Sequence, residues 1–358
     1  MLVHDFAGYG DVPAGRSLGA QALGAFGLEI RMKWGIERSP LMTRMSQLPV
    51  GGRLIRQQYD RFLRFKYELN WRWIQNPASS RSFQRCPPNL NALQKRLIEE
   101  LHDTGVASCH FAELFQDDAV WQSLSKEASE FSSDEAAQSV IKRRQQEFGQ
   151  THDFDAIQHY IFFKYPQDCK PLIKADNPLL NFHLNPLILD VANSYLAMWS
   201  KLIYFDIWYT VPLNTGSRFA SQRWHRDPED RRKIRTFLYF SRVDRDSGAM
   251  EYFLGSHYGG PYERVFPWND PLGIPYPPEG EVERQIPKSQ HVILEGPPGT
   301  LIFCDTAGFH RGGISRAIPR ILATSAFVTP ASLHRRRYEI DATVRNAAWS
   351  ASARFAVA

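Results

Sequence analysis

Beyond about residue 200 the sequence breaks into short apolar runs of strand length, and this pattern limits the fold more than any other feature. Six runs are rich in aromatic and β-branched residues: "KLIYFDIWYTV", "IRTFLYFSRV", "AMEYFL", "HVILEG", "TLIFCDT" and "RILATSAFV". The turn signals "DRDSGA" and "GPPG" stand between them. Because no helical periodicity interrupts the runs, residues 201 to 335 predict an antiparallel sandwich or jelly-roll barrel.

A proline-rich segment divides this strand region. Residues 261 to 287, "PYERVFPWNDPLGIPYPPEGEVERQIP", contain seven prolines. Proline donates no backbone hydrogen bond, so the segment is excluded from a central strand. We expect a long loop across one mouth of the barrel, and loops of this length in compact domains often act as lids.

The preceding part, residues 91 to 200, has mainly helical periodicity. In "LNALQKRLIEELHDTG" apolar residues recur at helical spacing and Gly105 supplies a C-terminal stop. In "SSDEAAQSVIKRRQQEF", Ser132 or Ser133 is the expected N-cap. The whole chain is therefore expected to be an α+β protein, with this helical region packed on the barrel and residues 336 to 358 as a C-terminal tail.

Residues 1 to 90 form a basic extension, and "RLIRQQYDRFLRFKYELNWRWIQ" (53 to 75) interleaves bases with aromatics. This pattern predicts a basic amphipathic helix. Its apolar face would pack on the catalytic domain, or the surface would make a weak contact with anionic lipid or a partner protein. The sequence leaves both interpretations open, and it leaves the oligomeric state open as well.

Charge and cysteine usage narrow the class of protein. The chain has 43 Lys+Arg against 38 Asp+Glu, and a formal net charge of +5 is too small to indicate nucleic acid binding. A small-molecule substrate, anionic or not, suits it equally well. Its four cysteines lack CxxC spacing, and no apolar stretch is long enough to span a bilayer. We therefore expect a cytoplasmic protein with reduced thiols.

The stretch "SQRWHRDPED" contains a histidine and an aspartate two positions apart. Residues two apart share a face of extended chain, so His225 and Asp227 can turn toward one point. His310, just beyond the run "TLIFC", is the best candidate for a third ligand. Two imidazoles and a carboxylate leave three positions open on Fe(II), as in non-haem iron oxygenases, whereas structural zinc takes a closed tetrahedral set.

An arginine follows His310 after ten residues. Arg320 begins the last apolar run, and a guanidinium inside an apolar barrel is suited to hold the far carboxylate of a diacid such as 2-oxoglutarate. Arg316 is a rival for this role. It precedes Pro319 in an expected turn, so Arg320 is preferred.

The order and spacing of four elements, "WHRD", "SGAMEYFLGSH", "PGTLIFCDTAGFHRGG" and Arg320, resemble the phytanoyl-CoA dioxygenase family of Fe(II)/2-oxoglutarate-dependent oxygenases. The resemblance covers about residues 200 to 330 and implies a double-stranded β-helix of the jelly-roll, cupin-like type. It implies that His225, Asp227 and His310 bind Fe(II), that Arg320 binds 2-oxoglutarate, and that O2 is the oxidant. The product of such a reaction is a hydroxylated metabolite, formed with release of succinate and CO2.

The chain departs from the family pattern at one position. Many relatives have a small hydroxyl residue two positions after the distal histidine, where this chain has Gly312, so that contact to 2-oxoglutarate is in doubt. Related halogenases lack the carboxylate of the HxD motif. The presence of Asp227 therefore implies hydroxylation, or an outcome derived from it such as desaturation or ring formation.

The cationic and aromatic residues around the HxD motif each allow a structural and a functional interpretation. The cations of this stretch would form a solvated charged loop or a mouth that steers an anionic substrate; they are Arg223, Arg226, Arg231, Arg232, Lys233 and Arg235. Aromatic residues would line the apolar part of the site; they are Tyr204, Trp208, Tyr209, Trp268 and Tyr276. Trp224 would wall the pocket or pack in the barrel, and His257 is expected to be structural.

Two other functions remain open. The barrel could serve as a binding or regulatory module without catalysis, or as a cupin-like metal enzyme that does not use 2-oxoglutarate. Arg320 separates the second from the main hypothesis, since such an enzyme has no diacid to bind.

Overall fold

The computed structural model describes residue 65 and residues 68–151, 160–165, 170–213, 218–266, 276–332, 334–341 and 349–358. The chain divides into two compact units, residues 1–77 with 269–273, and residues 78–268 with 274–358. In the first unit the described residues include the π-helix η1 (Asn70–Gln75). Most of the basic helix expected over 53 to 75 lies outside the described residues.

A six-stranded antiparallel sheet forms the larger layer of the second unit, in the order β1-β8-β5-β10-β4-β2. Its strands are β1 (Val106–His110), β2 (Ile161–Phe163), β4 (Lys201–Thr210), β5 (Ile234–Tyr239), β8 (Thr300–Cys304) and β10 (Arg320–Val328). The sequence predicted four of these runs, and the structure confirms them.

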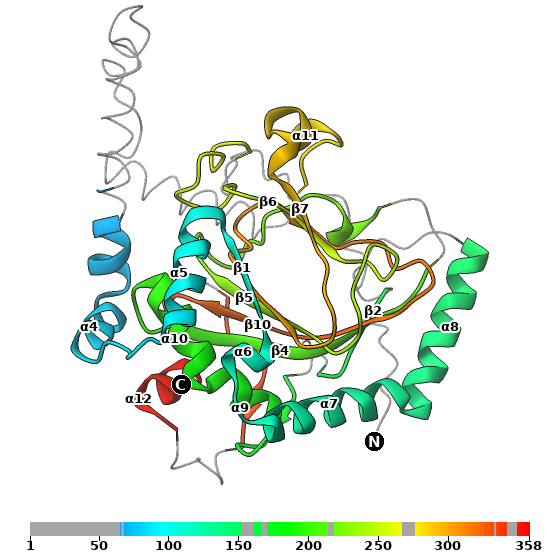
Figure 1. Cartoon of the computed structure of the whole chain (residues 1–358), viewed down its shortest axis with the longest axis horizontal. Coiled ribbons are helices and arrows are strands. Elements are labelled where there is room, and N and C mark those ends of the chain that lie inside the picture. The colour runs from blue at the N-terminus through cyan, green and yellow to red at the C-terminus, as the bar shows by residue number, and fades with distance from the viewer. Residues whose placement is uncertain are drawn as a thin grey trace, which may run out of the picture. The chain divides into compact units, whose positions relative to one another are not determined.

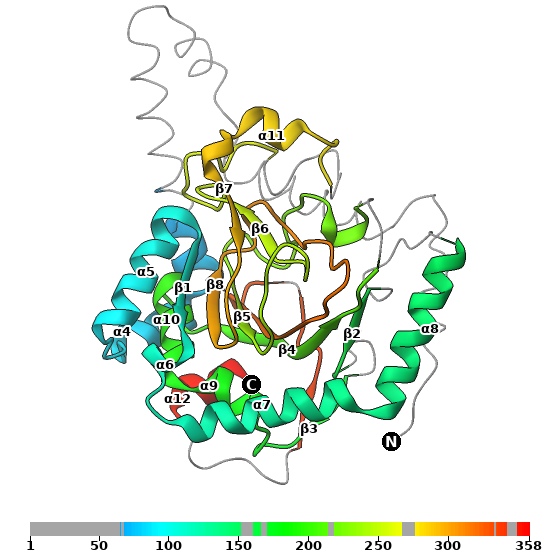
Figure 2. The same ribbon diagram turned by 45° about the vertical axis from the view of Figure 1, so that its right-hand side comes forward.

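A three-stranded antiparallel sheet, ordered β7-β6-β9, forms the smaller layer. Its strands are β6 (Met250–Phe253), β7 (His291–Leu294) and β9 (His310–Arg311), and an isolated bridge joins His225 to His310 at its edge. Met250 and Tyr252 of this sheet share one buried apolar cluster with Phe237 and Leu322 of the larger sheet. The two layers thus enclose a common core, and the fold is a double-stranded β-helix (Figures 1 and 2).

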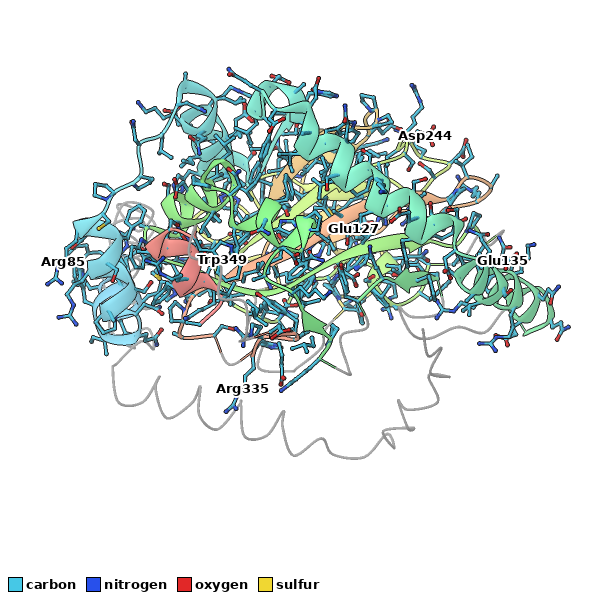
Figure 3. All side chains as sticks on the ribbon, turned by 90° about the horizontal axis from the view of Figure 1, so that it is seen from below. Arg85, Glu127, Glu135, Asp244, Arg335 and Trp349 are labelled. Atoms are coloured by element: carbon cyan, nitrogen blue, oxygen red, sulfur yellow. The ribbon has the colours of Figure 1, made fainter. Side chains whose placement is uncertain are left out.

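Helices cover the outer side of the six-stranded sheet. Helices α9 and α12 contact β4, α7 contacts β10, and α5 contacts β1 and β8. Figure 3 views this side, with Glu127 labelled on α7; its Oε1 accepts hydrogen bonds from Lys164 Nζ at 2.7 Å and Tyr165 OH at 2.6 Å. The helices before β4 are α4 (Pro77–Arg85), α5 (Ala92–Thr104), α6 (Phe111–Leu114), α7 (Asp118–Ser133), α8 (Glu135–Thr151), α9 (Pro178–Leu184) and α10 (Pro186–Leu196).

Local signals explain how these helices begin and end. Helix α5 starts with a capping box between Asn91 and Gln94 and ends at Gly105, whose φ of 86° is left-handed. This confirms the predicted stop. The N-cap expected for α8 was wrong, because Ala137 N donates to Asp134 Oδ1 at 2.9 Å, whereas the hydroxyls of Ser132 and Ser133 donate to the carbonyl of Ser129.

The region from 91 to 200 is less purely helical than expected. It also contains β1, β2 and β3 (Leu172–Ile173), and β1 and β2 occupy the two edges of the six-stranded sheet. Strand β3 pairs in parallel with β11 (Glu339–Ile340), which belongs to the tail. The remaining elements are η3 (Ala220–Gln222), α11 (Glu281–Gln285), η4 (Lys288–Gln290) and α12 (Ala351–Ala356).

Part of the proline-rich segment is described, on either side of residues 267–275. After the gap it forms α11, whose Val282 and Ile286 are buried in a small apolar cluster with Trp224, Phe253 and Phe309. In both ribbon views α11 lies at the end of the barrel near β6 and β7 (Figures 1 and 2). Because Trp224 directly precedes His225, this helix packs beside the HxD motif.

The described residues include no candidate membrane span, and three of their cysteines are free thiols. None of their helices is both long enough and apolar enough to cross a membrane. Cys86 is an exposed free thiol, and Cys109 and Cys304 are buried free thiols. Cys169 lies outside the described residues.

Candidate metal centre

Backbone pairing brings the two histidines together. His225 and His310 exchange N–H to O=C hydrogen bonds of 3.1 Å in both directions, and Asp227 N donates to Thr306 O at 2.9 Å. In this extended pairing His225 and Asp227 share one side, while Arg226 takes the other. The predicted ligand residues therefore come from two chain segments that the small sheet holds side by side.

The three side chains converge on one point. Asp227 Oδ1 lies 3.6 Å from Nε2 of His225 and 3.6 Å from Nε2 of His310. The two imidazole centroids are 4.3 Å apart. One ligand atom from each residue lies within 4.8 Å of the others, and all three residues are buried. A single metal ion between them would meet two nitrogens and one oxygen.

Hydrogen bonds determine the tautomer of each imidazole. His225 Nδ1 lies 2.8 Å from the carbonyl oxygen of Arg223, and His310 Nδ1 lies 3.0 Å from that of Gly308. A carbonyl can only accept, so each Nδ1 carries the proton and donates. Each Nε2 then faces Asp227 and is left to bind a metal, which is the orientation that metal-binding histidines need.

Protonation states favour a cation at this point. Burial lowers the pKa of His310, and the neighbouring His225 lowers it further, so His310 is neutral at physiological pH. Burial raises the pKa of Asp227, but the positive charges of Arg235 and Lys233 lower it more, to well below its usual range. Neutral imidazole and ionised carboxylate form the donor set that fits non-haem Fe(II).

The charged stretch after Asp227 is neither a solvated loop nor an open mouth. Glu229 and Arg232 are buried, and Lys233 is fully buried. Lys233 Nζ donates to Glu229 Oε2 at 2.8 Å, and Arg235 Nε lies 3.1 Å from Asp227 Oδ2. The charges of Lys233 and Arg235 are therefore paired with carboxylates inside the protein, next to the candidate metal centre. For these residues both predictions from the sequence, a solvated loop and a substrate-steering mouth, were wrong.

Arg226, the middle residue of the motif, binds backbone carbonyls. Its Nη1 donates to Ser256 O and Ala307 O at 2.5 Å each, and its Nε donates to Phe266 O at 3.1 Å. The guanidinium lies 4.0 Å from the centroid of the Phe309 ring. Arg226 thus fastens the loop after β6 to the segment that precedes His310, and its guanidinium is engaged within the protein.

Arg320 is buried at the start of β10, opposite Thr210 at the end of β4. Its Nε donates to Thr210 Oγ1 at 3.4 Å, and its Nη1 donates to the carbonyl of Gly248, just before β6. No carboxylate of the described residues forms an ion pair with it, and burial lowers its pKa. Arg316, the rival, is half exposed and pairs with Asp246 at 3.3 Å.

The backbone at Gly312 leaves room for a side chain. A Cβ there would meet Ser221 O at 3.7 Å and Gln222 Cγ at 3.9 Å, which are ordinary contacts. Nearby, the hydroxyls of Ser221 and Tyr160 hydrogen-bond to each other. The absence of a hydroxyl residue at 312 is therefore not imposed by space.

The aromatic candidates separate into two groups. Tyr276, beyond the undescribed part of the proline-rich segment, lies edge-on to His225 with 5.7 Å between centroids, and the guanidinium of Arg223 lies 5.0 Å from the Tyr276 centroid. Tyr204 and Trp208 flank Arg235 at 5.1 and 5.9 Å.

The other aromatic and histidine candidates lie away from this point. Tyr209 hydrogen-bonds to Gln138 of α8, outside the barrel, and Trp268 is among the undescribed residues. Trp224 is packed, with its indole N–H donating to Glu283 Oε1 at 2.5 Å. His257 is buried with its Nε2 3.0 Å from His102 O, which fits the structural role expected for it.

Sequence reasoning missed the position of Arg235. In "IRTFLYF" this residue alternates with Phe237 and Tyr239, so all three share one face of β5. Phe237 and Tyr239 belong to the apolar core between the sheets. That alternation was the available signal that the arginine points inward rather than to solvent.

Comparisons with known proteins give distant structural similarity. No protein-family model matches the chain, and no curated protein matches it in sequence. EctD from S. alaskensis, solved with 2-oxoglutarate and 5-hydroxyectoine, has 17% identity and a TM-score of 0.44, over 72% of this chain and 90% of EctD. The α-ketoglutarate-dependent epimerase SnoN of nogalamycin biosynthesis has 14% identity and a TM-score of 0.43, over 69% and 86%. AviO1 from Streptomyces viridochromogenes Tue57 has 15% identity and a TM-score of 0.42, over 68% and 98%.

Proposed function

We propose that this protein is an Fe(II)/2-oxoglutarate-dependent dioxygenase that hydroxylates an unactivated carbon of a small or medium organic metabolite. The observation that carries the proposal is the convergence of His225, Asp227 and His310, with neutral imidazole and ionised carboxylate at one buried point. Two nitrogens and one oxygen leave half the positions of an octahedral ion open for cosubstrates.

In this proposal His225, Asp227 and His310 hold the metal. The bound Fe(II) supplies the redox chemistry by which O2 oxidises 2-oxoglutarate to succinate and CO2 and transfers one oxygen atom to the substrate. The carbonyls of Arg223 and Gly308 keep each histidine in the tautomer that presents Nε2. Burial of all three residues limits the access of bulk water to the reacting centre.

Arg320 is the proposed binding residue for the far carboxylate of 2-oxoglutarate. Burying a guanidinium without a counter-charge is unfavourable, and the described residues provide Arg320 with no acidic partner. A dianionic cosubstrate would supply one, through two parallel hydrogen bonds. The hydroxyl of Thr210 and the carbonyl of Gly248 orient the guanidinium from two sides.

The two other functions make different demands on these residues. A binding or regulatory barrel needs neither the oriented histidines nor the ionised aspartate. A metal enzyme that does not use 2-oxoglutarate needs no buried arginine aimed between the sheets. The triad therefore favours the dioxygenase over the binding module, and Arg320 favours it over the other metal enzyme.

The anionic character of the substrate rests on fewer residues than the sequence suggested. With Arg226, Lys233 and Arg235 engaged inside the protein, Arg223 is an exposed cation that is linked to the centre through Tyr276. If the substrate is anionic, Arg223→Gln is expected to raise its KM and leave kcat unchanged, because the residue would act in binding alone.

The test is succinate formation from 2-oxoglutarate in the presence of Fe(II) and O2. Asp227→Ala is expected to abolish it, because one of three ligands is lost. Arg320→Ala should need about 100-fold more 2-oxoglutarate, since removing one partner of a buried charge pair costs roughly 3 kcal/mol. Arg316→Ala is the matched control and should behave as wild type. Wild-type cosubstrate affinity in Arg320→Ala would refute the assignment of Arg320.

A further inference from the structure

Arg235 is a largely buried arginine on a central strand, beside the candidate metal ligand Asp227. It is the second residue of β5, where it lies opposite Cys304 of β8 and Ala326 of β10. Both partners belong to the core between the two sheets, and the Arg235 side chain is 13% exposed. The side chain therefore enters the barrel from the larger sheet, while the ligands come from the smaller one.

The two oxygens of Asp227 face different partners. Oδ1 lies 3.6 Å from Nε2 of each histidine, on the side where a metal would bind. Oδ2 lies 3.1 Å from Nε of Arg235. One oxygen of the carboxylate therefore faces the metal position, and the other forms an ion pair with the guanidinium.

The surroundings of Arg235 hold this arrangement in place. The rings of Tyr204 and Trp208 flank the guanidinium at 5.1 and 5.9 Å, and its Nη2 lies 3.7 Å from Glu229 Oε1. The other oxygen of Glu229 accepts from Lys233. Because Lys233 already balances much of the charge of Glu229, the charge of Arg235 remains available to Asp227.

We propose that Arg235 is a positioning residue that limits Asp227 to coordination through one oxygen and thereby keeps a third position open on the metal. Carboxylates can bind a metal through one oxygen or two. With one oxygen, an octahedral ion keeps three open positions, and with two oxygens it keeps two. A 2-oxoglutarate chelate takes two, so the position left for O2 depends on Arg235. This inference rests on the proposed function.

Electrostatics predict an unusual effect of removing Arg235: metal affinity should not fall. A residue that only orients a ligand raises metal affinity, and its loss typically costs 10- to 100-fold. Arg235, however, is a largely buried positive charge that would repel a dication bound by Asp227. Its removal both relieves that repulsion and frees a second oxygen ligand. Metal affinity should therefore stay level or rise in a neutral variant, while the number of open positions falls.

The experiment counts the water molecules on a bound metal by water-proton relaxation, with Mn(II) as the probe in the full-length protein. Wild type is expected to hold three exchangeable waters on Mn(II) and to lose two of them when 2-oxoglutarate binds. Arg235→Gln should show a relaxivity roughly one-third lower before 2-oxoglutarate is added, and almost no inner-sphere relaxivity afterwards. Its Mn(II) dissociation constant should equal that of wild type or be lower.

Matched variants separate positioning from folding. Arg235→Lys retains a cation beside Oδ2 and should restore the relaxivity of wild type, and Arg316→Gln on the surface should not change it. If Arg235→Gln does not fold, Arg235→Met places an apolar chain between Tyr204 and Trp208 and carries the same expectation. A folded neutral variant with wild-type relaxivities, or one that loses tenfold or more in Mn(II) affinity, would overturn the inference. Failure of wild type to bind Mn(II), or to respond to 2-oxoglutarate, would instead refute the proposed function.

Discussion

Adjacent residues of the HxD motif perform opposite tasks because extended chain alternates its side chains. His225 and Asp227 face the barrel interior and converge with His310. Arg226 faces away and donates to carbonyls from three loop segments, one of them three residues before His310. Arg226 therefore anchors the backbone that positions His225 and Asp227. The motif thus contributes both to the candidate metal centre and to the stability of the fold.

This division predicts the effect of removing the middle arginine. Arg226→Gln should lower the free energy of unfolding by about 3 kcal/mol or more, because several buried carbonyls lose a charged donor at once. Urea denaturation measures the change. Arg223→Gln, three positions earlier in the chain and exposed, is the control and should stay within about 0.5 kcal/mol of wild type. Equal stability of the two variants would show that Arg226 does not fasten these segments.

At the scale of elements, α11 is linked to the residues that flank the candidate ligands. Glu283 accepts from the indole of Trp224, which precedes His225, and lies 3.5 Å from Nη1 of Arg311, which follows His310. Val282 and Ile286 pack in the same cluster as Trp224. A five-residue helix has little stability of its own, so these contacts hold it against the barrel.

Glu283 is therefore expected to control the local opening of α11. In Glu283→Gln the amides of Arg284 and Ile286, which donate to Gly280 and Val282, should exchange with solvent severalfold faster than in wild type. Hydrogen-deuterium exchange of this segment is the measurement. Glu281→Gln removes a neighbouring carboxylate that pairs only locally with Arg284 and serves as control. Equal protection from exchange in both variants would mean that the apolar contacts of α11 alone stabilise it.

At the scale of the whole molecule, the strand runs after residue 200 predicted the barrel because each run has strand length and strong turns separate the runs. Strands β1 and β2 could not be recognised, since their pairing partners β8 and β4 lie far along the chain and helices surround them. His225 and Asp227 were predictable from the alternation in HxD, and His310 from its place just beyond a strand run. The buried charge pairs were not, because composition does not show which arginine meets which carboxylate after folding.

The layer between the sheet and its helices contains a histidine that makes the stability of the molecule pH-dependent. His183 of α9 is fully buried among Phe182, Phe205 and Phe327, and burial lowers its pKa to about 3. The native state therefore keeps it neutral, while the unfolded chain takes up a proton below about pH 6.5. This contribution to stability is complete above pH 6.5 and is lost as the pH falls.

The corresponding prediction compares wild type with His183→Leu. As the pH falls below 6.5, the free energy of unfolding of wild type should decline relative to the variant by roughly 1.4 kcal/mol for each pH unit, down to about pH 4. Urea denaturation at a series of pH values measures it. Parallel pH profiles for the two proteins would mean that His183 binds its proton in the folded state.

The central claim is that three buried residues hold Fe(II) with room for 2-oxoglutarate, and an anaerobic titration tests it most directly. Purified wild type should bind one Fe(II) and, on addition of 2-oxoglutarate, develop a visible charge-transfer absorption that saturates at one equivalent. Asp227→Ala should develop no such absorption, and Arg320→Ala should do so only at much higher 2-oxoglutarate. A wild-type protein that binds no Fe(II), or whose metal spectrum does not respond to 2-oxoglutarate, would contradict the account.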